Sequence, residues 1–150
     1  MMPRMGPEGY RYSAHHLWVS RIGRIARVGI TDFAQRELGE VLFVELPEVD
    51  DELERNETFG EIESGRTTSE LVMPVSGTVV AVNEDLDEAP GAVNEDPYGR
   101  GWLVEVELAD PSELEELLDA DAYARLVDAE ADPDDASARP QGENGNADDR

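Results

Sequence analysis

Lysine and cysteine are both missing from the 150 residues of this sequence, and so is any long apolar run. Without cysteine there is no disulfide, no thiolate nucleophile and no zinc site built on thiolates. A membrane span needs an apolar stretch of roughly 18 residues, which the sequence does not contain. The N-terminal segment also lacks the apolar core of a signal peptide. We therefore expect a cytoplasmic protein with no membrane partner.

Positive charge is scarce. All 12 basic residues are arginine, and 36 acidic residues bring the formal net charge to −24. This balance excludes a general basic surface for nucleic acid. It suits a protein that must stay soluble at high salt or that docks on basic partners, and self-repulsion at low salt favours a monomer. The lack of lysine has two explanations: drift from lysine to arginine throughout the chain, or loss of one modification site. Because the whole chain shows it, drift is the preferred general cause.

Short segments with alternating apolar residues predict a mainly β fold. The expected strands are 16–20, 24–30, 41–46, 59–64, 69–73, 78–82 and 102–108. Thr31 and Gly39 fit the N-cap and C′ positions of one short helix. Asp110, followed by Pro111, predicts the start of another helix. Short strands joined by tight turns favour a compact barrel or sandwich over a parallel α/β sheet.

The chain is long enough for one domain with a core of its own. We expect a loose leader at 1–11, a folded domain at 12–128 and a disordered acidic tail at 129–150. Alanine is almost the only apolar residue of the tail, which cannot offset its ordering entropy by burial. Within the domain, residues 83–101 are rich in turn formers and hold two N-E-D triplets. A last short helix is expected around 122–127.

No familiar catalytic arrangement is present. The sequence has no G-x-S-x-G, no phosphate-binding glycine loop and no H-E-x-x-H. His15 and His16 are the only histidines, and in a strand they would face opposite ways. We interpret them as edge residues flanking Trp18 rather than as metal ligands. The acidic runs 48–54 and 84–88 lack the ligand spacing of a calcium loop. We expect no catalytic residue and no metal site.

The segment Glu63–Gly77 (E-S-G-R-T-T-S-E-L-V-M-P-V-S-G) predicts a β-hairpin with one long cation at its tip, Arg66. A tip held between paired strands is a rigid mount for a flexible arm. Tethering a cofactor there needs a lysine amine, so Arg66 is a degenerate attachment position. The candidate site residues around it in the hairpin are Glu63, Ser64, Gly65, Thr67 and Ser69.

Four blocks of the sequence resemble the H protein of the glycine cleavage system, in the lipoyl-domain superfamily. They are V-G-I-T-D-F-A-Q-R-E-L-G-E-V-L-F-V-E-L-P-E-V (28–49), F-G-E-I-E-S (59–64), P-V-S-G-T-V-V-A-V-N-E (74–84) and V-N-E-D-P-Y-G-R-G-W-L-V-E-V (93–106). The resemblance extends from Tyr12 to about Val127 and implies a barrel-sandwich hybrid fold without catalytic residues of its own.

The resemblance also implies a shuttle role and three partners. The lipoyl arm of the family accepts an aminomethyl group from the pyridoxal-phosphate glycine decarboxylase, the P protein. The arm presents this group to the folate-dependent aminomethyltransferase, the T protein. It is then reoxidised by the flavin-dependent dihydrolipoamide dehydrogenase, the L protein.

The sequence departs from the family pattern at the attachment position. Where the family has Val-Lys-Ala, this chain has Gly65, Arg66 and Thr67. A lysine amine has a pKa of about 10.4, and a guanidinium has one above about 12, so only the amine becomes a neutral nucleophile at modest cost. Because the sequence contains no lysine at all, no neighbouring residue can take over the attachment. We therefore expect no lipoate, and a non-carrier docking or regulatory paralogue.

Two alternative functions stay open: a functional aminomethyl carrier, and a lipoyl-type fold recruited to an unrelated binding task. Arg66 itself has two interpretations. It is either an exposed tip cation without a function or a cation that an acidic pocket of a partner recognises.

Overall fold

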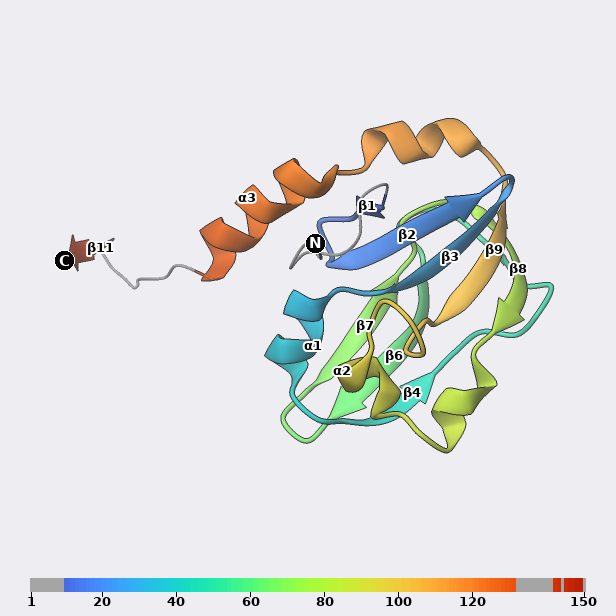
Figure 1. The fold of residues 1–150 in the computed structure, drawn as a ribbon, viewed down its shortest axis with the longest axis horizontal. Coiled ribbons are helices and arrows are strands. Elements are labelled where there is room, and N and C mark those ends of the chain that lie inside the picture. Colours follow the sequence, from blue (N-terminus) through green and yellow to red (C-terminus); the bar gives the residue numbers. More distant parts are fainter. Residues whose placement is uncertain (1–9, 132–141, 144, 150) are drawn as a thin grey trace. The chain divides into compact units, whose positions relative to one another are not determined.

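The structure, a computed structural model, describes residues 10–131, 142, 143 and 145–149, and it divides into two compact units at Ala120. The described part of the first unit holds a six-stranded and a three-stranded sheet, all of whose pairings are antiparallel (Figure 1). The larger sheet has the order β1 (Arg11–Tyr12), β2 (Leu17–Ile22), β3 (Ile25–Ile30), β9 (Val104–Leu108), β8 (Gly77–Val82) and β5 (Glu52–Leu53). The smaller sheet has the order β4 (Val41–Glu45), β6 (Thr58–Ser64) and β7 (Thr68–Val72). The mainly β prediction is confirmed.

The core is built from the inward-facing residues of both sheets. Val28 and Val106 come from the larger sheet, and Val44, Ile62 and Leu71 come from the smaller one, all within a single buried cluster. The apolar alternation that predicted the strands is the alternation that fills this core. The two strands that carry the hairpin tip, β6 and β7, are therefore anchored in the core by Ile62 and Leu71.

Short helices connect the strands. They are α1 (Asp32–Leu38), the 3₁₀ helix η1 (Glu84–Asp87), α2 (Ala92–Glu95) and the 3₁₀ helix η2 (Pro111–Glu116). Helix α1 begins and ends where the sequence predicted, because the Thr31 hydroxyl accepts the N–H of Ala34 at 3.2 Å and Gly39 takes a φ of +79°. No helix in the described ranges is long and apolar enough to cross a membrane.

Three local expectations need correction. The turn-rich segment 83–101 contains η1 and α2. Asp110 does cap a helix, but this helix is of the 3₁₀ type and ends at Glu116. His15 and His16 lie in the turn before β2 rather than in a strand, and His16 takes a φ of +69°.

The ends of the domain also differ from the expected boundaries. Arg11, placed in the leader, pairs with Val19 in β1 and β2. Helix α3 (Ala120–Ala131), which belongs to the second unit from Asp121 on, runs three residues into the predicted tail. The same unit contains β11 (Gly142–Glu143) and β12 (Gly145–Asp149), a parallel pair that the sequence did not predict. The predictions for 1–9, 132–141, 144 and 150 fall outside the described residues.

Two aromatic side chains, Trp18 and Tyr98, connect the start of α1 to the larger sheet. The Trp18 indole donates to the Pro97 carbonyl at 3.0 Å, and its ring centroid lies 6.0 Å from that of Tyr98. The Tyr98 hydroxyl accepts the N–H of Asp32, the first residue of α1, at 3.1 Å. Burial raises the pKa of Tyr98 to about 12.

This raised pKa predicts a loss of stability at alkaline pH. The unfolded phenol ionises near pH 10, so the contribution of neutral Tyr98 is complete below about pH 10 and falls by up to about 1.4 kcal/mol per unit as the pH rises toward 12. We expect Tyr98→Phe to lose about 1 kcal/mol at neutral pH with its hydrogen bond. Above pH 10 the free energy of unfolding of this variant should fall less steeply with pH than that of wild type.

Urea unfolding at neutral pH and at two alkaline values measures both effects. Some loss of stability at alkaline pH should remain in the variant, because burial raises the pKa of Tyr12 as well. An alkaline slope identical to that of wild type would contradict the prediction for Tyr98.

Candidate functional site

The predicted tip is the turn Gly65–Thr67 between β6 and β7. Its backbone is organised by the buried Ser64. The Ser64 hydroxyl accepts the N–H groups of Arg66 and Thr67 at 3.3 and 3.2 Å and donates to the Thr67 carbonyl at 3.1 Å. The Ser64 N–H donates to the same carbonyl at 2.8 Å. The tip therefore has a fixed backbone, and the side chains of Arg66 and Thr67 take no part in this hydrogen-bond set.

The tip is attached to the end of α1. The N–H of Gly65 donates to the carbonyl of Glu40 at 3.3 Å, and Nη1 of Arg66 donates to the carbonyl of Glu37 at 3.2 Å. A Cβ built on Gly39 would lie 3.3 Å from Nε and Nη2 of Arg66. Carbonyls in the last turn of a helix lack intrahelical partners and carry the negative end of the dipole. Arg66 is exposed, yet it caps α1, a role that neither sequence interpretation included.

Asn94 of α2 fixes the other side of the same helix end. Its Oδ1 accepts the N–H of Val41 at 2.9 Å, and its Nδ2 donates to Gly39 O at 2.8 Å and to Gln35 Oε1 at 3.0 Å. Figure 1 shows α2 next to α1. Sequence reasoning missed Asn94, although it begins one of the two N-E-D triplets. Asn83, which begins the other, donates to the carbonyls of Arg100 and Trp102.

Removing the Asn94 amide should destabilise the domain. We expect Asn94→Ala to cost about 2–3 kcal/mol, since it leaves part-buried groups of Val41, Gly39 and Gln35 without their partner. Asn94→Asp should also destabilise, because a carboxylate cannot donate to the Gly39 carbonyl. Urea unfolding measures both, with exposed Glu95→Gln as the neighbouring control. A loss within about 0.5 kcal/mol for Asn94→Ala would contradict this role.

A small apolar cleft of about 140 Å³ lies between the hairpin and α1. It is lined by His15, His16, Leu17, Ile30, Phe33, Ala34, Glu37, Leu38, Ile62, Ser69, Glu70 and Leu71. The His16 ring lies 4.8 Å from that of Phe33, so this histidine packs at the cleft rather than beside Trp18 as expected. Among the described residues no group of three or more His, Asp or Glu side chains could hold a metal ion.

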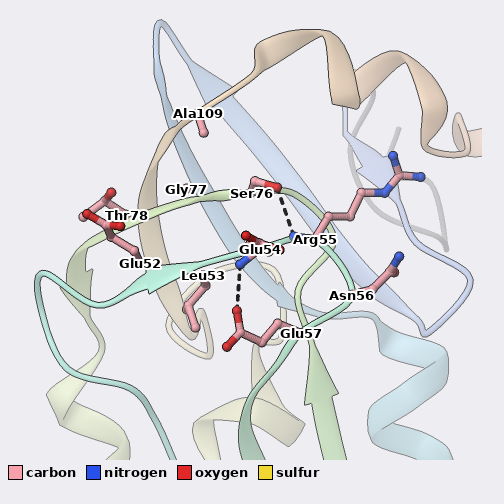
Figure 2. A pocket seen from close by; sticks show the side chains of 10 residues that line it. All are labelled: Glu52, Leu53, Glu54, Arg55, Asn56, Glu57, Ser76, Gly77, Thr78 and Ala109. Carbon is pink, nitrogen blue, oxygen red and sulfur yellow. Dashed lines mark hydrogen bonds between the residues drawn. The ribbon is translucent and has the colours of Figure 1, made fainter.

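A wider and more open cleft of about 710 Å³ lies along β5 and the start of β8 (Figure 2). The Arg55 N–H donates to the Ser76 hydroxyl at 3.0 Å, and the Arg55 guanidinium is paired with Glu116. The Ser76 hydroxyl and the Ser76 N–H both donate to the Glu113 carboxylate, at 3.0 and 2.7 Å. Arg55, Ser76, Glu113 and Glu116 are thus bonded to one another at this cleft. The lining shares no residue with the tip.

Known proteins are similar to this chain along most of its length. The family model described as glycine cleavage H-protein matches residues 10–130. A glycine cleavage system H protein of Staphylococcus epidermidis is 51% identical over 121 residues, 81% of this chain and 96% of the relative. That of Halalkalibacterium halodurans is 53% identical over 124 residues, 83% and 97% of the two chains.

Solved structures give the same result. The crystal structure of a glycine cleavage system H protein from Mycobacterium marinum has a TM-score of 0.73 and 39% identity, covering 79% of this chain and 96% of that one. This likeness confirms the barrel-sandwich hybrid fold that the sequence blocks implied.

Proposed function

The chain belongs to the glycine cleavage H-protein family, and from this premise we propose that it docks on the glycine cleavage enzymes without carrying lipoate. H proteins are carriers and not catalysts, so the chain is not an enzyme. The observation that supports the finer proposal is the residue at the hairpin tip. Arg66 stands there, and the sequence contains no lysine.

The tip fits a cofactor arm as a mount but not as an attachment. Ser64 fixes its backbone, and Glu63-Ser64 before it and Pro74–Gly77 after it match the blocks that flank the family's lysine. The chemistry does not fit, because an acyl group must be attacked by a neutral amine and a guanidinium stays protonated. The Arg66 guanidinium is also engaged with the Glu37 carbonyl. We therefore derive no acyl-carrying step for this chain.

The partners of this proposal are the decarboxylase, the aminomethyltransferase and the dihydrolipoamide dehydrogenase of glycine cleavage. A chain that keeps the H-protein fold but lacks the arm would occupy their docking surfaces without delivering an aminomethyl group. It would therefore act as a competitor or a scaffold for the loaded H protein. The cytoplasmic location stays a prediction from the sequence.

Intact-mass measurement of the protein purified from its native source tests the absence of lipoate. We expect the unmodified mass, with a purified lipoylated H protein measured in the same way as the positive control. A lipoyl adduct would overturn the proposal in favour of the aminomethyl carrier. Capture of the purified decarboxylase by the unmodified chain tests docking, and no capture would favour the recruited fold.

A further inference from the structure

Strand β4 places two large apolar side chains on the surface. It is an edge strand of the smaller sheet, and its register with β6 shifts between Val41 and Phe43. Consecutive residues of a regular strand face opposite sides, but a bulge sets two residues against one partner. Leu42 and Phe43 are 53% and 54% exposed, whereas Val44 is buried. Large exposed apolar residues side by side are typical of an interaction surface.

Carboxylates lie beside Phe43 in the sheet. Phe43 is paired with Glu63, and Glu45 is paired with Glu61, which is paired on its other side with Glu70. All four carboxylates are exposed, and none belongs to an ion pair of the described residues. Like charges directly opposite each other in a sheet are destabilising. The sheet thus carries an uncompensated negative charge next to exposed apolar groups.

We propose that Leu42, Phe43, Glu45, Glu61 and Glu63, named the β4 face, bind a partner protein that presents an apolar contact ringed by arginine or lysine side chains. This inference rests on the proposed docking on the glycine cleavage enzymes and names the surface that docks. The β4 face adjoins the hairpin tip, because Val41 is paired with Ser64 and the Glu40 carbonyl holds Gly65.

The charge of the molecule disfavours a second copy as the occupant. A two-fold contact through the β4 face would bring the same surface of both chains together and place the carboxylates of Glu45, Glu61 and Glu63 of one chain near those of the other. With a net charge of −24, the rest of each chain adds to this repulsion. A basic partner instead gains attraction from the same carboxylates while its apolar centre covers Phe43.

Binding of the purified glycine decarboxylase to the immobilised full chain tests the β4 face. We expect Phe43→Ser to weaken binding about tenfold or more at any salt concentration, as for a central aromatic contact. We expect Glu61→Gln combined with Glu63→Gln to weaken it about fivefold at low salt and far less near 1 M salt, where screening acts within about 3 Å. These positions are exposed, and thermal unfolding of each variant checks that the fold is intact.

Two matched controls lie on the other sheet. Ile22→Ser removes an apolar residue that is 81% exposed, and Glu52→Gln combined with Glu107→Gln removes two exposed charges. Both should bind within about twofold of wild type. If wild type binds and the β4-face variants bind like the controls, the inference is overturned while docking stands. If wild type does not bind, the proposed docking fails and this inference with it.

Discussion

Arg66→Lys is expected to accept one lipoyl group from a lipoate–protein ligase, whereas the wild-type chain stays unmodified under the same conditions. Ser64 fixes the tip backbone, so the substitution leaves the loop in place; it supplies the amine and removes the guanidinium contact with the Glu37 carbonyl. A gap of about two pKa units or more between lysine and arginine makes the neutral nucleophile at least about a hundredfold more abundant. Intact mass after incubation with ligase, ATP and lipoate measures the result as presence or absence of the adduct.

The matched control for this experiment is Arg36→Lys. Arg36 lies on α1 with an exposed side chain that pairs with Asp32 at 2.8 Å, so the variant offers the same amine away from the tip. We expect no lipoyl group on it. If Arg66→Lys also stays unmodified, the missing amine is not the obstacle, and Gly65 and Thr67 become the candidates for what the ligase rejects. A modified wild-type chain would refute the non-carrier proposal itself.

Gly60→Ala is expected to destabilise the domain strongly, although it adds only one methyl group. A Cβ at Gly60 would lie 2.1 Å from the carbonyl oxygen of Glu45 on the neighbouring strand. The oxygen belongs to the backbone of β4, and the Cβ would be bonded to the backbone of β6, so the two strands would have to separate to relieve the clash. We expect a loss of at least about 3 kcal/mol in the free energy of unfolding and about 10 °C in Tm.

Gly65→Ala is the control for Gly60→Ala. A Cβ at Gly65 meets nothing within 4 Å, and its φ is not in the left-handed range. We expect a change within about 0.5 kcal/mol, with stabilisation favoured because alanine reduces the entropy of the unfolded chain. Calorimetry and urea unfolding compare the two variants. Equal stabilities would show that the two strands separate more easily than their register suggests.

The sequence predicts elements whose signals are local. Helix α1 is predicted correctly because Thr31 and Gly39, its two caps, adjoin it in the chain. The seven longer strands of the two large sheets are predicted because their apolar residues recur locally, whereas the two-residue strands β1 and β5 give no such signal and were not predicted. The order of the four blocks points to the family that the comparisons confirm. Local sequence patterns are thus sufficient to predict the fold class and the family.

What the sequence could not give depends on contacts between distant residues. Asn94 binds residues 53 to 59 positions away, so α2 had no local signal beyond turn formers. Arg66 reaches Glu37, 29 positions earlier, and its capping role follows only from the folded hairpin. The bulge in β4 arises from pairing with β6, which is why the exposure of both Leu42 and Phe43 was not expected.

Ser64 makes the shape of the turn independent of the residue that follows Gly65, since every bond it forms there is to main-chain atoms. A mutation in one codon could thus exchange amine for guanidinium at residue 66 while the loop conformation stays the same. Loss or recovery of cargo would then require no intermediate with a damaged fold. A gene duplicate could in this way leave the shuttle pathway in one evolutionary step and keep its binding surfaces under selection.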